Sequence, residues 1–160
     1  MEAKHIARAL LFTPDPRLTL QVAASLLTIE RVETTASVTF SGEYTDFLLQ
    51  TNGVWVGGDA LLGVPPVEAA LDGLQTRELF LQDWPPGAGW WPVASDGLGN
   101  YYVLMTRPPD GVGGAPVGFV ETGTSLSKIH SVVASSYWAF VFFISLNTCG
   151  PSTGGRCGKD

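Results

Sequence analysis

Residues 89–104, GWWPVASDGLGNYYVL, constrain the fold of this chain more than any other stretch. Two runs of aromatic and β-branched residues, at 90–94 and 101–104, flank a loop made of Ser, Asp, Gly, Leu and Asn. This pattern predicts two antiparallel strands joined by a hairpin. A dinucleotide-binding loop needs Gly-x-Gly-x-x-Gly between a strand and a helix, whereas the glycines here lead into a strand. We therefore expect a hairpin and no cofactor.

The remaining elements place this hairpin in a mixed fold. Helices are expected at residues 1–12, 18–33, 42–53, 67–84 and 125–146, with Ser41 as a helix cap and Gly73 as a break. Short strands are expected at 54–66 around two glycines, at 90–94, at 101–104 and at 117–122. Helices followed by clustered strands indicate an α+β fold, a central antiparallel sheet flanked by helices, rather than alternating βαβ units.

The length of 160 residues suits a single domain. We expect this domain to span residues 1–147, with its core at about 18–147, and a flexible Gly-rich tail at 148–160. The longest apolar stretch, residues 132–146, is shorter than the roughly 18 residues of a membrane span. It is expected to be buried, either in this domain or in an interface with another chain. No secretory signal is visible, so the expected location is the cytoplasm.

The charge of the chain narrows the class of partner. Its formal net charge is −6 and no basic run is present, so direct binding to nucleic acid is not expected. An acidic surface suits a basic protein partner, because opposite potentials steer association.

Residues that carry out catalysis or bind metal are sparse. The two cysteines, Cys149 and Cys157, lie in the tail, and the two histidines, His5 and His130, are far from them in sequence. Zinc requires about four ligands, so we interpret the cysteines as free thiols and expect no metal site. A nucleophile with its base cannot be assembled from so few histidines.

Paired carboxylates are the other source of catalysis that the sequence offers. Glu43, Asp46, Asp96 and Glu121 are candidates for a glycosidase-like pair, with nearby tryptophans to stack on sugars. No spacing selects two of them, so the sequence does not predict an enzyme.

The aromatic residues of the hairpin offer a binding surface. Neighbours on a strand point to opposite faces, so Trp90 and Trp91 diverge, as do Tyr101 and Tyr102. One residue of each pair can fill the core while the other lies exposed at a protein interface or a sugar platform. The alternative, that helices cover both faces of the sheet, remains open.

Several segments together resemble the SUKH superfamily, named from a yeast cell-wall synthesis regulator and its bacterial relatives. The family motif Tyr-x-x-Phe-Leu-x-x-x-Asn-Gly is matched by Tyr44, Phe47, Leu48, Asn52 and Gly53. The segments LLGV, GWWPVASDGLGNYYVL, PVGFVET and SSYWAFVFFI follow in the family's order, so the resemblance covers residues 29–144. Phe-Ser stands at residues 40–41 where the family has Leu-Pro.

The resemblance implies a single α+β domain without catalytic residues. Bacterial members of the family are similar to immunity proteins that neutralise toxins, often nucleases, by binding them; eukaryotic members look like regulatory scaffolds. The expected function is therefore an immunity protein, with a regulatory scaffold or a carbohydrate-binding or glycosidase-like protein as alternatives. The residues expected at or near the partner surface are Trp91, Asp96, Asn100, Tyr102 and Glu121, whereas Tyr44 and Trp90 are expected to be structural.

Overall fold

A computed structural model describes residues 2–12, 16–84, 89–106, 115–121, 129 and 131–148 of the chain. In that part of the chain the elements are α1 (Glu2–Phe12), β1 (Leu18–Leu20), α2 (Leu26–Ala36), α3 (Gly42–Leu48), β2 (Val54–Val56), β3 (Asp59–Leu61), η1 (Ala69–Leu71), α4 (Gly73–Phe80), η2 (Leu81–Asp83), β4 (Trp90–Ser95), β5 (Tyr101–Met105), β6 (Val117–Val120), β7 (Ser131–Ala134) and α5 (Tyr137–Thr148).

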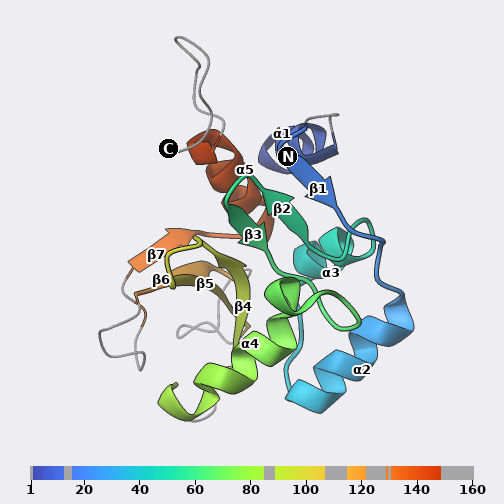
Figure 1. The fold of residues 1–160 in the computed structure, drawn as a ribbon, viewed down its shortest axis with the longest axis vertical. Helices are drawn as coiled ribbons and strands as arrows, with labels where there is room; N and C mark the ends of the chain where they lie inside the picture. Colours follow the sequence, from blue (N-terminus) through green and yellow to red (C-terminus); the bar gives the residue numbers. More distant parts are fainter. Residues whose placement is uncertain are drawn as a thin grey trace.

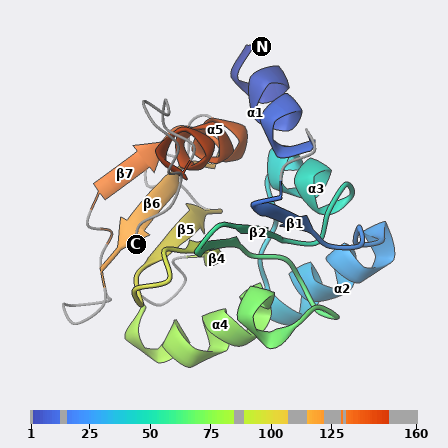
Figure 2. The ribbon, with the colours of Figure 1, turned by 45° about the horizontal axis from the view of Figure 1, so that its top comes forward.

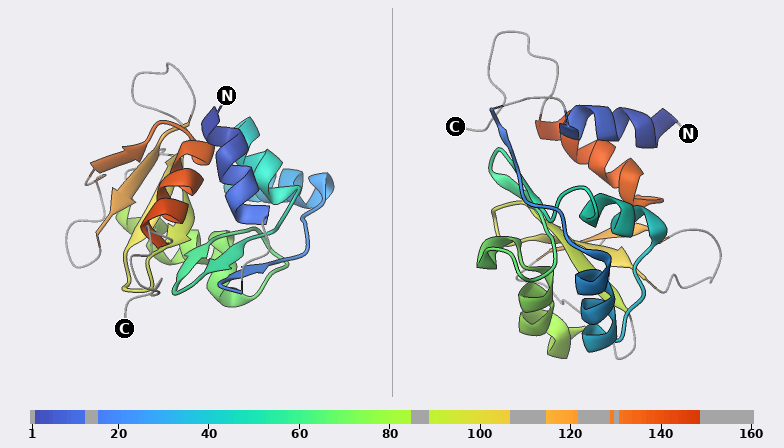
Figure 3. Two further views of the ribbon diagram at one scale, coloured as in Figure 1. Left: turned by 90° about the horizontal axis from the view of Figure 1, so that it is seen from above. Right: turned by 90° about the vertical axis from the view of Figure 1, so that its right-hand side faces the viewer.

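The seven strands in these ranges form one antiparallel sheet in which each strand pairs with its neighbours in the sequence (Figure 1). Helices α1, α3 and α5 lie over one face of the sheet, and α4 lies against the opposite face (Figures 2 and 3). The predicted α+β domain with a central antiparallel sheet is therefore confirmed.

The hydrophobic core has a main cluster on the α5 face of the sheet and a smaller one under α4. The largest buried side chains of the main cluster are aromatic: Tyr44, Phe47, Trp91, Tyr137 and Trp138. The smaller cluster contains Trp84, Trp90, Val103, Met105 and Val120. Both faces of the β4–β5 hairpin are thus covered, because each strand sends alternate side chains to opposite sides.

The segment after Arg17 differs from the helix predicted at residues 18–33. Residues Leu18–Leu20 form β1, which pairs with β2, and helix α2 begins only after Ser25. The Ser25 hydroxyl accepts a hydrogen bond from the Thr28 N–H, and the helix ends at Ser37, where φ is 54°. Ser is a favoured N-cap, so this cap fixes a start that the apolar spacing alone did not reveal.

The C-terminal segment differs in a similar way from the helix predicted at residues 125–146. Residues Ser131–Ala134 form β7, which pairs with β6, and only Tyr137–Thr148 is helical, as α5. Most of the apolar helix packs inside its own domain, since Tyr137, Trp138 and Phe140 are buried in the main cluster. In the described residues, no helix is long and apolar enough to cross a membrane.

Two other helices show how local sequence sets an element's start. Helix α3 begins after Ser41, whose hydroxyl accepts a hydrogen bond from the Tyr44 N–H, which confirms the predicted cap. The helical stretch predicted at residues 67–84 is interrupted at the predicted place: η1 ends at Leu71, and α4 begins at Gly73 with Asp72 as its cap, accepting from the Gln75 N–H. A Cβ atom at position 73 would lie 2.9 Å from the Gly63 carbonyl oxygen, so the residue allows a close approach of two backbones.

Candidate functional site

The loop of the β4–β5 hairpin is held together by one side chain. Asp96 Oδ1 accepts hydrogen bonds from the Leu98 N–H at 2.8 Å and from the Asn100 N–H at 3.1 Å. Its Oδ2 accepts from Asn100 Nδ2 at 2.8 Å. Gly97 and Gly99 have positive φ angles of 74° and 92°, which glycine adopts without strain. Asp96 and Asn100 therefore give this loop a defined shape.

A second turn lies against this loop. The β2–β3 turn contains Gly57 and Gly58, and a Cβ atom at Gly97 would come within 2.8 Å of the Gly58 carbonyl oxygen. The strands behind the two turns also pair, with Ala60 opposite Ser95. The two tips thus form one continuous surface, to which Asp59 contributes a carboxylate at the start of β3.

Tyr102 lies next to these carboxylates. Its ring is half-buried, with centroids 5.0 Å from Phe140 of α5 and 5.2 Å from Phe119 of β6. Burial, followed by the negative charges of Asp96 and Asp59, raises the pKa of the Tyr102 hydroxyl. The phenol is therefore neutral at physiological pH and available as a hydrogen-bond donor and acceptor.

Glu121 completes the group at the end of β6. Tyr101 of β5 pairs with Val120 of β6, so the next positions along the two strands, Asn100 and Glu121, lie side by side at the end of the ladder. We call the set Asp59, Asp96, Leu98, Asn100, Tyr102 and Glu121 the hairpin-tip surface. The structure thus brings together four of the five residues predicted at a partner surface.

Charge and exposed apolar area meet on the hairpin-tip surface. Leu98 lies between the two glycines of the loop and is 74% exposed, a high value for a leucine in a loop that is otherwise fixed. No Lys or Arg occurs between Arg77 and Arg107 in the sequence. The surface therefore combines an apolar side chain with the carboxylates of Asp59, Asp96 and Glu121, and Arg17 borders it at the β2–β3 turn. Its excess of negative charge suits a basic protein partner.

Trp91 is not part of this surface, and its predicted exposure is wrong. The side chain is fully buried: its indole N–H donates to the Tyr44 hydroxyl at 3.1 Å, and its ring centroid lies 4.8 Å from that of Phe40. Trp90 points to the other side and is buried against Trp84, with centroids 5.7 Å apart. The predicted alternation is correct, but helices cover both faces, so neither tryptophan is free to bind a protein or a sugar.

The residues of the Tyr…Asn-Gly motif build the core. The Tyr44 hydroxyl donates to the Leu62 carbonyl oxygen at 2.9 Å. The Asn52 side chain forms two hydrogen bonds with Val64, accepting from its N–H at 2.7 Å and donating to its carbonyl oxygen at 2.6 Å. Each of these polar groups is buried and paired, so the motif marks a structural joint between α3, β2 and the segment after β3.

The described part of the chain offers little for catalysis. Across its described ranges, no group of three or more His, Cys, Asp or Glu residues is placed to hold a metal ion. Of the candidate carboxylates, Asp46 pairs with Lys4 at 3.2 Å and Asp96 holds the hairpin loop. Cys149, Cys157 and His130 lie outside the described residues.

Three residues that the structure places on exposed surfaces were not predicted as site residues from the sequence: Leu98, Asp59 and Trp55. Four of the five tryptophans are buried, and Trp55 is the exception. Its neighbours on β2, Val54 and Val56, are buried, so the alternation in VWV was the available signal that Trp55 faces the other side.

Comparison with known proteins adds one finding. Residues 27–141, most of the chain, match the family model SUKH_6, described as SMI1-KNR4 cell-wall. The match begins in α2 and ends in α5, so α1 and β1 lie outside it. A search of curated proteins found no match.

Proposed function

This chain belongs to the SUKH family of SMI1-KNR4 proteins, and on that premise we propose that it is an immunity protein that neutralises a toxin by direct binding. The family includes immunity proteins, which act by occupying their partner and not by chemistry. We infer that this chain is likewise a non-catalytic binding domain, acting in the cytoplasm of the cell that it protects.

The observation that carries this proposal is the hairpin-tip surface. A side chain such as Leu98, held on a fixed loop, costs little conformational entropy when it enters an apolar pocket of a partner. The surrounding carboxylates attract Lys and Arg side chains and raise the rate of encounter. A nuclease fits this description, since an enzyme that binds a phosphate backbone is itself basic around its active site.

The proposed mechanism is blockade of the toxin's own substrate site. Asp59, Asp96 and Glu121 stand in for phosphate groups, and Leu98 anchors the contact. Tyr102 and Asn100 contribute neutral hydrogen-bonding groups between the charges. Trp91 has no place in this contact because it is buried.

A capture experiment tests the assignment. The full chain is used as bait in lysate of its source organism, beside the variant Leu98→Ser and the matched control Leu79→Ser, which removes another leucine, 67% exposed, on α4. We expect a basic toxin domain to be captured by the wild type and by the control, and to be lost from the Leu98→Ser bait. Equal capture by all three baits would show that Leu98 of the hairpin-tip surface does not contact the partner.

A regulatory scaffold is the second candidate, because the family takes its description from the cell wall. Capture of a cell-envelope or housekeeping regulator, with no toxin in the eluate, would favour that function over immunity.

A further inference from the structure

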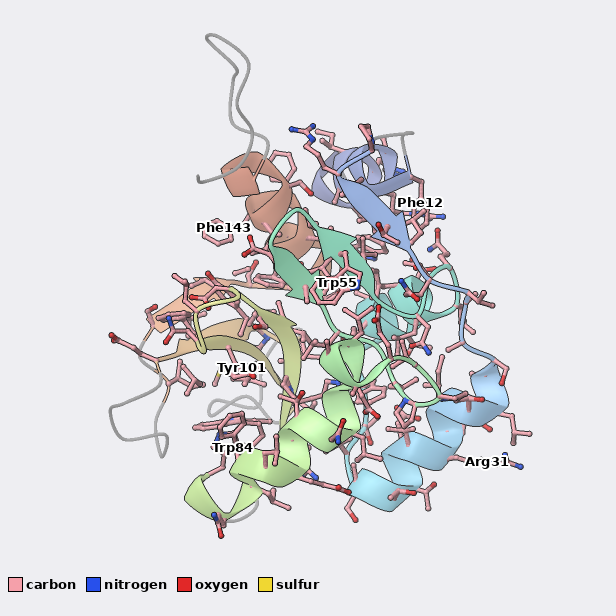
Figure 4. The ribbon with its side chains drawn as sticks, in the orientation of Figure 1. Phe12, Arg31, Trp55, Trp84, Tyr101 and Phe143 are labelled. Carbon is pink, nitrogen blue, oxygen red and sulfur yellow. The ribbon has the colours of Figure 1, made fainter. Side chains whose placement is uncertain are left out.

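The outer face of strands β1–β3 is a second surface, distinct from the hairpin-tip surface. Cross-strand pairing aligns Thr19, Trp55 and Ala60 on this face, opposite to the buried Val54 and Val56. Helix α4 packs against β4, further along the sheet, and the short η1 packs on the end of β3, where Leu71 contacts Ala60; Figure 4 shows the Trp55 side chain beside it, over β2 and β3. The described helices therefore leave only part of this face open, and Trp55 lies at the border of the part that η1 covers; we call it the Trp55 face.

Trp55 is held in a fixed position on this face. Its indole N–H donates to Glu68 Oε1 at 2.7 Å, a short hydrogen bond to a charged acceptor. Part of the ring packs against the small cluster formed by Ala60, Leu62 and Leu71. The remainder faces solvent, where Figure 4 shows the side chain over β2 and β3. A large aromatic ring held in this way loses little conformational freedom when a partner binds it.

The charges around Trp55 favour a cation. Glu68 is exposed, and among the described residues no Lys or Arg forms an ion pair with it. No Lys or Arg occurs in the sequence between Arg31 and Arg77, so the loop that borders the ring carries only negative charge. A basic residue, Arg17, lies near this face just before β1, and its carbonyl oxygen accepts from the Gly57 N–H.

We propose that the Trp55 face binds an arginine side chain of a protein partner. The planar guanidinium group stacks on the indole ring and donates to the carboxylate of Glu68, a combination that the compact ammonium group of lysine matches less well. This surface lies on the opposite side of the sheet from Tyr102, so it adds a second contact that the proposed immunity function does not require.

The test uses the full chain and a fluorescently labelled eight-residue peptide of alternating Gly and Arg, with Gly-Lys and Gly-Gln peptides for comparison. Fluorescence anisotropy gives each affinity. We expect the Arg peptide to bind more tightly than the Lys peptide, and the Gln peptide not to bind. Replacing Trp55 by Leu should weaken Arg-peptide binding about two- to fivefold, the range of an exposed cation–π contact.

Charge variants separate this contact from general attraction to an acidic protein. Glu68→Gln and Glu30→Gln remove the same charge, the first beside Trp55 and the second on the exposed side of α2. We expect only Glu68→Gln to weaken binding beyond the small effect of net charge, and Arg17→Gln to strengthen it. Thermal denaturation checks that each variant is folded.

Three outcomes would overturn the proposal. The first is wild-type affinity in both the Trp55→Leu and the Glu68→Gln proteins. The second is an equal loss in Glu68→Gln and Glu30→Gln, which would reduce the binding to net charge. The third is saturable binding of a chito-oligosaccharide at Trp55, which would make the face a sugar platform.

Discussion

Replacing Tyr44 by Phe tests whether the motif tyrosine holds the core together. The hydroxyl lies at the centre of a short chain of hydrogen bonds: it accepts from the indole N–H of Trp91 and donates to the carbonyl oxygen of Leu62. All three residues are almost fully buried. The substitution removes one oxygen atom, leaves the aromatic packing with Phe40 and Phe47 in place, and strands two buried polar groups.

The expected loss follows from those two groups. A buried donor or acceptor left without a partner costs about 1–3 kcal/mol, and the loss of the buried hydroxyl itself offsets part of this sum. We expect the free energy of unfolding to fall by about 3 kcal/mol. For a chain of this size, each kcal/mol lowers the melting temperature by about 2–4 °C, so the midpoint should fall by roughly 6–12 °C.

Urea unfolding followed by far-UV circular dichroism measures the change. The matched control is Tyr101→Phe, because Tyr101 is half-buried beside Phe80 and its hydroxyl has no hydrogen-bond partner among the described residues. The control should change stability by less than about 0.5 kcal/mol. If Tyr44→Phe lowers the free energy of unfolding by no more than Tyr101→Phe does, the chain of hydrogen bonds is not what holds α3 against β4.

Three further predictions concern other parts of the fold. Asn52→Ala leaves both backbone groups of Val64 unpaired, so urea titration should show that the free energy of unfolding falls by roughly 2–5 kcal/mol. A fall of less than about 1 kcal/mol would show that Asn52 does not hold the segment after β3 in place. Burial raises the pKa of the Tyr44 and Tyr137 hydroxyls above the usual value of about 10. Their stabilising contribution is therefore complete below about pH 10 and is lost as the pH rises through the folded pKa values. The free energy of unfolding, measured from pH 8 to 12, should fall only above about pH 10. Asp96→Ala should accelerate hydrogen exchange of the hairpin-loop amides and leave the melting temperature within a few degrees, whereas unchanged exchange would show that Asp96 does not fix the loop.

Elements that carry their own local signals were predictable from the sequence. The β4–β5 hairpin has Asp96 and two positive-φ glycines in its loop, and α3 has its cap at Ser41. Strands β1 and β7 were mistaken for parts of helices because their sequences are short and apolar. Their strand conformation comes from pairing with β2 and β6, contacts that a local window of sequence does not contain.

The site was predictable in part for the same reason. Asp96, Asn100 and Tyr102 belong to one hairpin, so their proximity follows from its sequence. The burial of Trp91 does not, because alternation gives opposite directions to Trp90 and Trp91 but says nothing about which face a helix covers. Packing of Tyr44 and Phe40 against one side and of Trp84 against the other decides that question.

Titration of the captured partner's activity is the decisive measurement of whether this chain neutralises a toxin by occupying it. Purified chain is added in steps to a fixed concentration of toxin well above the dissociation constant, and residual toxin activity is measured after equilibration. We expect a linear fall to zero at one equivalent of chain per toxin, and the same titration with Leu98→Ser should leave toxin activity at that point. Full activity beyond one equivalent, or complete loss at a small fraction of an equivalent as an enzyme would cause, would contradict this mechanism.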